Sequence, residues 1–492
     1  MKKIMKSVLL LAAVFTMASC SNDWLDMEPS DALPTSEAIS NYKDATSALN
    51  GIYDGLQGNS DAVSYYARNM FFYGDVRGDD MQARTQGMRS SALYEMRYTE
   101  DDAPVIWVTP YNVIRRANNL LEAIEAGKVS DATEEQLNDI IAQAKAVRAL
   151  VHFDLVRIYG KPYTVDNGAS AGVPIVTRPV GADEQLSRNT VAEVYDQVIL
   201  DLTEAINSNA LSTEKTLGMF NVWAAKALLC RVYLYKGDNQ NALAMAEDVI
   251  NNSPYELWTN SEYVNGWVGD NRKEMILEII NYNSSDWADR EGIAYCLNED
   301  GYADAIVTQA FSDLLNKDPN DVRQGVILKP TVNSDMIDEF GEQQVFVNKF
   351  PAKEPGGDFR VSNLPLLRIS EMYLNAAEAA AKLGQSDKAA QYLNAIVLRA
   401  NPEATEVSPA DATVDRILDE RRLELVGEGH RFFDLMRNNK TVVRYESTSD
   451  MGRHYALIQE SMKFDNTYFR AILPIPISEI NANPNIEQNP GY

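Results

Sequence analysis

Long stretches of this chain repeat apolar residues every three to four positions, which is the spacing of an amphipathic helix. The pattern predicts helices over residues 112–126, 134–159, 190–206, 221–236, 241–251, 366–383 and 388–399. A helix with one apolar stripe must bury that stripe against another element, so these segments need one another. The sequence therefore predicts a mostly α protein.

Two pairs of these segments have the spacing of a helical repeat. In the first pair, Trp223, Cys230, Tyr233, Ala242 and Pro254 stand at positions 1, 8, 11, 20 and 32 of a unit that begins at residue 223. Those positions match much of the tetratricopeptide pattern, which repeats about every 34 residues. The second unit turns at residues 384–386 and has Ala377 and Ala389 where two helices touch. We predict two helical hairpins, with Cys230 as a small core residue.

Residues 255–365, between the two hairpins, have a different character. They lack long helical periodicity and contain several segments rich in Gly, Asn, Ser and Pro, which favour turns and loops. They are also rich in aromatic residues: Tyr255, Trp258, Tyr263, Trp267, Tyr282, Trp287, Tyr295 and Tyr302. A long irregular insertion in a helical body usually carries function, so we expect this segment to form a binding face.

The N-terminus has the features of a secretory signal. Three lysines precede an apolar stretch over residues 8–15, which is too short to span a bilayer. Small residues then lead to Cys20, as in a bacterial lipoprotein signal. We predict that residues 1–19 are removed and that Cys20 carries lipid, followed by an acidic tether over residues 20–34. The alternative is an ordinary signal peptide with a chance cysteine.

Charge and composition exclude several classes of function. The chain has 45 lysine and arginine residues against 71 aspartate and glutamate residues, a net charge of −26, which argues against binding nucleic acid. Three cysteines and three histidines leave little for a disulfide scaffold or a metal site, and no metal or cofactor is predicted. The sequence also contains no zinc-protease, serine-hydrolase, phosphate-loop or dinucleotide motif.

Short blocks along the chain form a recognisable ordered set. They are WLD at 24–26, ALNGIY at 48–53, KAVRALVHFDLV at 145–156, YGKPY at 159–163, LRISEMYLNAAEA at 367–379, ILDERRLEL at 417–425, EGHRFFDLMR at 428–437, LPIP at 473–476 and PNIEQNPGY at 484–492. Together they resemble the SusD/RagB family of outer-membrane nutrient-binding lipoproteins.

This resemblance implies a SusD-like fold, in which four tetratricopeptide-like hairpins support an irregular, loop-rich ligand-binding face. It also implies a lipid-anchored protein at the outer cell surface, a SusC-like TonB-dependent barrel as partner, a glycan ligand and no catalytic activity. After the signal peptide (1–19) and tether (20–34), we expect a single body over 35–492, with an N-terminal part at about 35–236, the aromatic insertion at about 255–365 and a C-terminal part at about 366–492.

The family's ligand-binding residues lie outside its motifs, so we choose candidates by chemistry. Sugars offer C–H faces that stack on aromatic rings and hydroxyls that bond to Asp, Asn and Arg. We predict Trp267, Trp287 and Tyr295 as stacking platforms, and Asp75 and Arg77 as hydroxyl contacts. The alternative for each aromatic residue is packing within the loops.

We interpret several other aromatic and charged residues as structural and not as ligand contacts. We expect Trp107 and Tyr111 in the core, and Asp79 and Asp80 on a solvated surface. The charged run over residues 420–437 is expected to hold helix junctions through arginine–carboxylate pairs, including Asp434 with Arg437. We expect the same of two pairs elsewhere, Arg368 with Glu371 and Arg148 with Asp154.

Three functions other than glycan binding remain open from the sequence. The same fold could bind peptides or another nutrient. A glycoside hydrolase would need two positioned carboxylates, and acidic residues are abundant here. A tetratricopeptide scaffold without small ligands would need no binding face at all.

Overall fold

The computed structural model describes residues 38–58, 65–85, 87–104, 106–181, 183–269, 272–282, 291–328, 344–354 and 357–492. The predicted signal peptide, Cys20 and the tether lie outside the described residues, as does Trp287.

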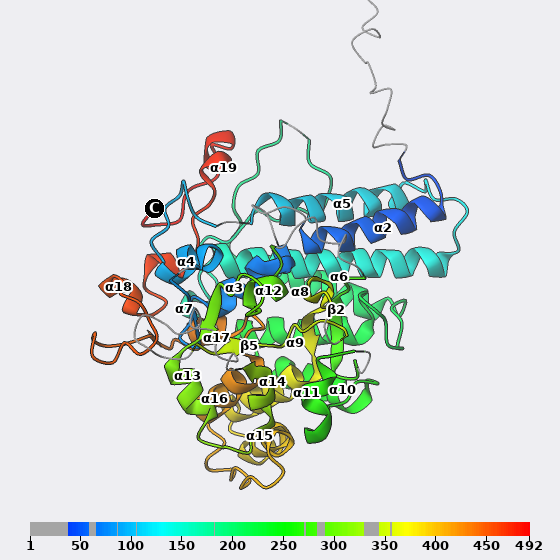
Figure 1. The fold of residues 1–492 in the computed structure, drawn as a ribbon. Coiled ribbons are helices and arrows are strands. Elements are labelled where there is room, and N and C mark those ends of the chain that lie inside the picture. The colour runs from blue at the N-terminus through cyan, green and yellow to red at the C-terminus, as the bar shows by residue number, and fades with distance from the viewer. Residues whose placement is uncertain are drawn as a thin grey trace, which may run out of the picture.

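Long helices form a continuous stack (Figure 1). They are α2 (Tyr42–Gln57), α5 (Val108–Glu125), α6 (Glu134–Tyr159), α8 (Val191–Asn207), α9 (Val222–Lys236), α10 (Asn239–Asn252), α14 (Ile369–Lys382), α15 (Ser386–Ala400) and α16 (Val414–Leu425). From α5 to α15, each long helix packs on the next, and α2 and α16 pack on α5 and α14. The mostly α prediction is confirmed.

Short elements make up the rest of the described chain. The short α-helices are α3 (Met70–Asp75), α4 (Met88–Glu95), α7 (Tyr163–Asp166), α11 (Tyr263–Gly266), α12 (Ile293–Leu297), α13 (Gln309–Leu315), α17 (Arg431–Arg437), α18 (Gln459–Met462) and α19 (Ile477–Ala482). A π-helical turn, η2 (Tyr65–Asn69), precedes α3, and the 3₁₀ turns are η3 (Asn260–Glu262), η4 (Val322–Val326), η6 (Phe359–Val361) and η7 (Phe469–Ala471).

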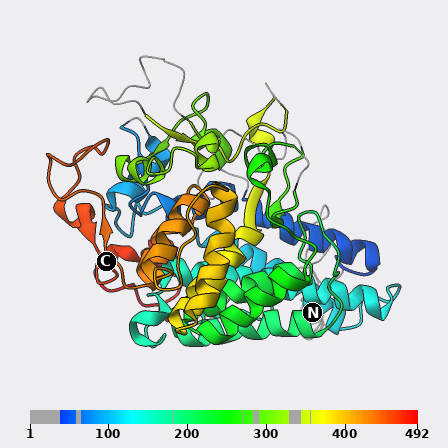
Figure 2. The same ribbon diagram turned by 90° about the horizontal axis from the view of Figure 1, so that it is seen from below.

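Strands occur in pairs, and every pair is antiparallel: β1 (Met81–Ala83) with β3 (Ala305–Val307), β2 (Met275–Ile279) with β6 (Leu364–Arg368), β4 (Ile327–Leu328) with β5 (Phe346–Val347), and β7 (Val442–Val443) with β8 (Lys463–Phe464). Three of these pairs involve the predicted insertion. In Figure 2 the long helices occupy the lower half of the molecule and the short elements of the insertion lie mainly in the upper half.

Local sequence explains where the helices begin and end. Thr133 opens α6 with a capping box, in which its side chain accepts from the Gln136 backbone N–H and the Gln136 side chain accepts from the Thr133 N–H. Gly237 ends α9 in the left-handed region at φ 82°, which allows the sharp turn into α10. Cys230 packs across this hairpin, with its Sγ 3.3 Å from the Ala242 carbonyl oxygen. Both predicted hairpins, α9–α10 and α14–α15, are present.

The predicted start of helix α14 was wrong, and α5 begins at Val108, four residues before its predicted start. The apolar run at 366–383 begins as strand β6, and helix α14 starts only at Ile369. Every residue of β6 is buried, and a short continuous apolar run fits a buried strand as well as a helix.

The charged residues form buried ion pairs, but two predicted pairings are wrong. Arg368 pairs with Glu274 and Glu428 at 2.7 Å, while Glu371 pairs with Arg231 at 2.6 Å. These partners come from other elements, so spacing along the chain does not reveal them.

The second wrong pairing lies between α6 and its neighbours. Arg148 pairs with Asp201 of α8 at 2.6 Å, and Asp154 pairs with Arg157 of its own helix. The predicted pair of Asp434 and Arg437 is present at 2.7 Å. The architectural interpretation of the charged run is therefore confirmed, whereas the individual partners depend on tertiary packing.

No helix among the residues described here combines the length and apolar character that a bilayer crossing requires.

Candidate functional site

Three aromatic rings meet on the loop-rich side of the body, and we call Tyr295, Tyr302 and Phe359 the aromatic platform. The Tyr295 ring lies 4.9 Å from the Tyr302 ring, edge to face, and 5.0 Å from the Phe359 ring at a tilt of 31°. Tyr302 is 37% exposed, and the other two are half-buried. The platform therefore offers ring surface to solvent in a fixed arrangement.

The short helix α12 directs Tyr295 outward. Its other side chains, Ile293, Ala294, Cys296 and Leu297, are all buried, so the helix is held by its inner side. The chain then turns back, and the Tyr302 backbone N–H donates to the Tyr295 carbonyl at 2.9 Å. A Cβ on Gly301 would lie 2.1 Å from that carbonyl oxygen, so only glycine permits this close return.

An arginine lies over the outer ring of the platform. The Arg89 guanidinium carbon is 3.5 Å from the centre of the Tyr302 ring. Glu291 accepts hydrogen bonds from Arg89, which raises the pKa of the guanidinium further and fixes its plane. Glu291 also accepts from Arg68 at 2.6 Å. The charge of Arg89 is thus already matched by a carboxylate.

A second arginine at the platform is neutralised in the same way. Arg360 of η6 makes a bidentate pair with Asp358, through Nε to Oδ1 at 2.8 Å and through a second nitrogen to Oδ2 at 2.5 Å. The pKa of Arg360 is raised by this hydrogen bonding. Arg89 and Arg360 therefore present planar donor groups with little net positive charge.

An open groove of about 610 Å³ lies beside the platform. It runs between the end of α2, the 217–219 loop and the end of β2, and its polar and aromatic lining comprises Tyr53, Asp54, Gln57, Glu278 and Tyr282. Tyr282 is 71% exposed. The next residue back, Asn281, accepts from the Gln57 amide and lines a small notch with Tyr295 and Arg360. Asn281 thus connects the groove to the platform.

These groups suit a ligand with flat apolar faces and many hydroxyls. Exposed rings bind C–H faces by removing apolar surface from water, and planar amide and guanidinium groups set the orientation through hydrogen bonds. Within the described ranges, no cluster of His, Cys, Asp and Glu is arranged to hold a metal ion. The arrangement can therefore bind such a ligand through ring stacking and hydrogen bonds.

Of the two predicted stacking residues that the structure describes, Tyr295 lies on the platform and Trp267 does not. Trp287 is outside the described residues. Trp267 is 4% exposed, and its ring packs 5.4 Å from Trp258 and 4.9 Å from the Arg368 guanidinium. A ligand cannot reach the Trp267 ring in this structure, so the interpretation as loop packing holds for it.

The two predicted hydroxyl contacts are also buried. Asp75 is 2% exposed, and its Oδ2 accepts from the Gly429 N–H at 2.8 Å. Burial raises the pKa of Asp75 well above its usual range. Arg77 is 0% exposed, donates to the Tyr73 and Ala471 carbonyls, and lies 3.9 Å from the centre of the Phe432 ring. Both residues join the N-terminal part to the C-terminal part and do not face a ligand.

The expectation that Asp79 and Asp80 are solvated is wrong as well. Asp79 pairs with Arg431 at 2.6 Å, and Asp80 pairs with Arg422 at 2.7 Å. Trp107 is buried and Tyr111 partly buried beside it, with ring centres 5.0 Å apart, as expected for core residues.

The sequence interpretation missed Arg89, Glu291 and Phe359. Tyr302 belonged to the aromatic insertion but carried no other signal. Arg89 comes from α4, far from the insertion in sequence, so only the folded chain brings it onto the Tyr302 ring.

Comparison with known proteins settles the family. A family model described as "SusD family" matches residues 270–492, and one described as "Starch-binding associating with outer membrane" matches residues 23–234. A solved SusD superfamily protein from Bacteroides thetaiotaomicron is 40% identical, with a TM-score of 0.84 over 92% of this chain and 100% of that chain. The chain belongs to the SusD family.

Other solved structures extend this comparison. A putative sugar-binding protein from Bacteroides vulgatus is 40% identical, with a TM-score of 0.83 over 92% of this chain and 99% of its own. A laminarin-binding SusD-like protein is 26% identical, with a TM-score of 0.70 over 92% of this chain and 100% of its own. Both the resemblance to the SusD/RagB family and the mostly α SusD-like fold are confirmed.

Proposed function

We propose that this SusD-family protein binds oligosaccharide or polysaccharide nutrients on the aromatic platform and in the adjoining Tyr282 groove, without cleaving them. The observation that carries the proposal is the Tyr295–Tyr302–Phe359 arrangement with Arg89 stacked on its outer ring. The family description, which names starch binding, and the laminarin-binding relative support a glycan over other ligands.

The ligand we propose is a neutral glycan. Arg89 and Arg360 each have a carboxylate partner, so the platform offers little free positive charge to sulfate or uronate groups. The whole chain has a net charge of −26, which disfavours anionic polymers further. Each sugar ring that covers platform surface gains about 25 cal/mol per Å² of apolar area removed from water.

Hydrolysis is not part of the proposal. A glycosidase needs one carboxylic acid and one carboxylate flanking the scissile bond at a separation of roughly 5–10 Å. At the platform, Glu291 is held by Arg68 and Arg89, and Asp358 is held by Arg360. In the groove, Glu278 is held by Arg272, and Asp54 is exposed at the groove wall with Arg116 3.9 Å away.

Anchoring and delivery complete the proposal. Lipid on Cys20 would hold the protein at the outer membrane through the tether over residues 20–34. The first described helix, α2, belongs to the long-helix side, and the insertion lies mainly on the other side (Figure 2). Attachment through α2 therefore leaves the platform accessible. A SusC-like TonB-dependent barrel would receive the bound glycan, in keeping with the family resemblance.

Binding can be tested on the mature protein with a panel of polysaccharides, using affinity electrophoresis followed by calorimetry. We expect retardation by at least one neutral glycan and no release of reducing sugar. Tyr302→Phe, which keeps the ring, should bind like the wild type, whereas Tyr302→Ala should bind more weakly. Binding of peptides in place of every glycan would reject the sugar and favour the peptide-binding alternative.

A further inference from the structure

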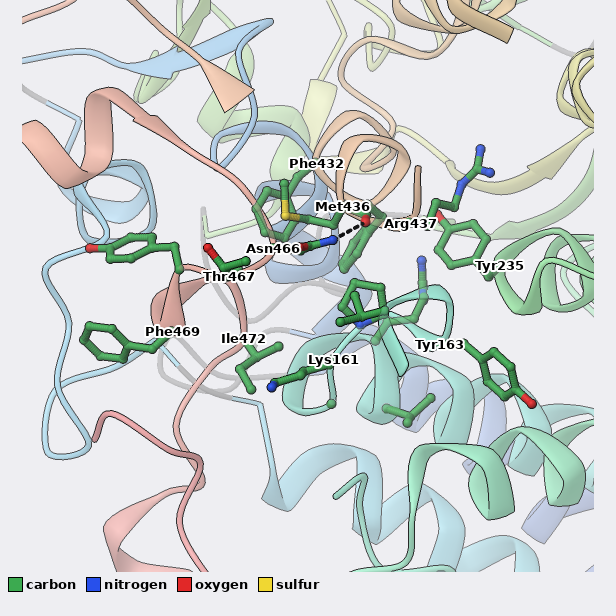
Figure 3. Close-up of a pocket in the computed structure, with 18 of the residues that line it drawn as sticks. Lys161, Tyr163, Tyr235, Phe432, Met436, Arg437, Asn466, Thr467, Phe469 and Ile472 are labelled. Atoms are coloured by element: carbon green, nitrogen blue, oxygen red, sulfur yellow. Dashed lines mark hydrogen bonds between the residues drawn. The ribbon is translucent and has the colours of Figure 1, made fainter. Parts of the chain in front are cut away.

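A separate pocket of about 260 Å³ lies where the end of α6, α7, α17 and the segment around η7 meet (Figure 3). It shares no lining residue with the platform or the Tyr282 groove. In Figure 3, Lys161 and Ile472 lie on one side of the pocket, and Phe432, Met436 and Asn466 lie on the other. The family function proposed above makes no use of this pocket.

The walls of the pocket are fixed by contacts between its elements. The Thr164 hydroxyl of α7 donates to the Arg437 carbonyl of α17 at 2.8 Å. The Leu473 N–H, beside η7, donates to the Ile158 carbonyl of α6 at 2.9 Å. The pocket is therefore formed before any ligand arrives, which lowers the entropic cost of binding.

Aromatic rings dominate the lining: Tyr163, Tyr195, Tyr235, Phe432, Phe433, Tyr468 and Phe469. They meet at angles, with Tyr163 and Tyr195 5.2 Å apart at 57° and Phe432 and Phe433 5.7 Å apart at 72°. Rings set at such angles present both edges and faces, and an aromatic guest can pack against them edge to face.

The charged residues that line the pocket are all basic. No Asp or Glu lines the pocket, although the chain has 71 of them, and the charged lining residues are Arg157, Lys161 and Arg437. Arg157 pairs with Asp154, and Arg437 pairs with Glu378 and Asp434 behind the wall. Lys161 is exposed and has no carboxylate within ion-pair distance among the described residues. An unpaired cation therefore stands at a pocket rich in aromatic side chains.

We propose that this pocket binds a small aromatic carboxylate, with its ring among the aromatic side chains and its carboxylate on the Lys161 ammonium group. The volume of about 260 Å³ lies just below the range of roughly 300–1,000 Å³ typical of sites for drug-sized ligands, which suits a compound with one ring. A helix or strand of a partner protein is too large for a pocket of this volume.

The test uses the full mature chain with phenylacetate and cinnamate as probes, followed by saturation-transfer NMR and calorimetry. We expect saturable binding of at least one acid, and weaker binding of cinnamyl alcohol, which has the same ring but no charge. Lys161→Gln should weaken binding of the acid about fivefold, as expected for a partly exposed ion pair. Lys317→Gln, which changes an exposed lysine elsewhere, should leave binding unchanged.

A second variant tests the location. Val165 lies at the pocket and is 38% exposed, so Val165→Trp can fill the space without disturbing the core, and it should abolish binding while the melting temperature stays near that of the wild type. The proposal would be overturned if neither acid bound saturably to the wild type. It would also be overturned if Lys161→Gln and Val165→Trp both bound the acid as tightly as the wild type does. Equal affinity for cinnamyl alcohol would overturn the role of the carboxylate. None of these outcomes depends on glycan binding.

Discussion

The Arg89 guanidinium lies 3.5 Å from the centre of the Tyr302 ring. Glu291, just before α12, pairs with Arg89 and holds it in this position. This contact joins α4 to the turn after α12, so a single stacked pair orders the outer edge of the aromatic platform. Because Tyr302 is the most exposed ring of the three, its orientation determines how much flat surface a ligand meets.

Arg89→Ala should therefore weaken glycan binding about three- to tenfold, since the cation–π contact that orients Tyr302 is worth roughly 0.5–2 kcal/mol. Calorimetry with the best glycan of the panel measures the loss. Arg97→Ala is the matched control, because Arg97 is exposed and pairs with Glu95 away from any ring contact of the platform. An unchanged affinity in Arg89→Ala would show that the stacked pair does not shape the site.

Trp267→Ala separates a core role from a ligand role. The side chain is buried against Trp258, Tyr263 and Arg368, so its removal should cost about 3–5 kcal/mol of unfolding free energy. Urea denaturation measures this. If the variant were as stable as the wild type and had lost only glycan binding, Trp267 would be a ligand contact after all.

Arg368→Met should also be strongly destabilising. Arg368 lies between the carboxylates of Glu274, Glu424 and Glu428, and its loss leaves them buried without their shared cation. We expect a cost of about 3–5 kcal/mol in urea denaturation. Lys463→Met is the control, because its pair with Glu446 is exposed and should contribute less than about 1 kcal/mol.

Acid should weaken the fold through Glu371. Burial alone would raise the pKa of this carboxyl, but the buried Arg231 guanidinium outweighs burial and lowers the pKa from 4.5 to about 2. A carboxyl with a depressed pKa in the folded state stabilises fully above its unfolded pKa. That contribution is lost as the pH falls from about 4.5 to about 2.

Glu371→Gln tests this assignment. The variant should be less stable than the wild type at neutral pH, and the gap should narrow as the pH falls through that window. Urea titrations of both proteins at several pH values measure the difference, which cancels the contribution of other groups. A gap that stays constant down to the lower end of the window would contradict the pairing with Arg231.

The long helices were predictable because their signal is local. The period of 3.6 residues places the core face of α6 directly, and its observed bounds equal the predicted ones, Glu134–Tyr159. The Gly237 turn and the small residue Ala242 likewise mark a hairpin from sequence alone. The start of α14 failed, where a buried apolar strand has no period to distinguish it from a helix, α5 begins four residues before its predicted start, and α2 was not predicted.

The site was less predictable because exposure is a tertiary property. Trp267 and Tyr295 look equivalent in the sequence, as aromatic residues in one irregular segment. The fold covers the first with Arg368 and Trp258, whereas one turn of α12 faces the second outward. Arg77 has the chemistry of a sugar contact, but it is fully buried, and its Nε and one terminal nitrogen donate to the Tyr73 and Ala471 carbonyls.

The most direct measurement for the central claim is calorimetry of the double variant Tyr295→Ala/Tyr302→Ala against wild type, with the neutral glycan that binds best and with the melting temperature as a check on folding. The account predicts a folded variant that binds at least tenfold more weakly, because about 1.4 kcal/mol or more of ring contact is removed. A folded variant with wild-type affinity would contradict the assignment of the platform as the glycan-binding surface.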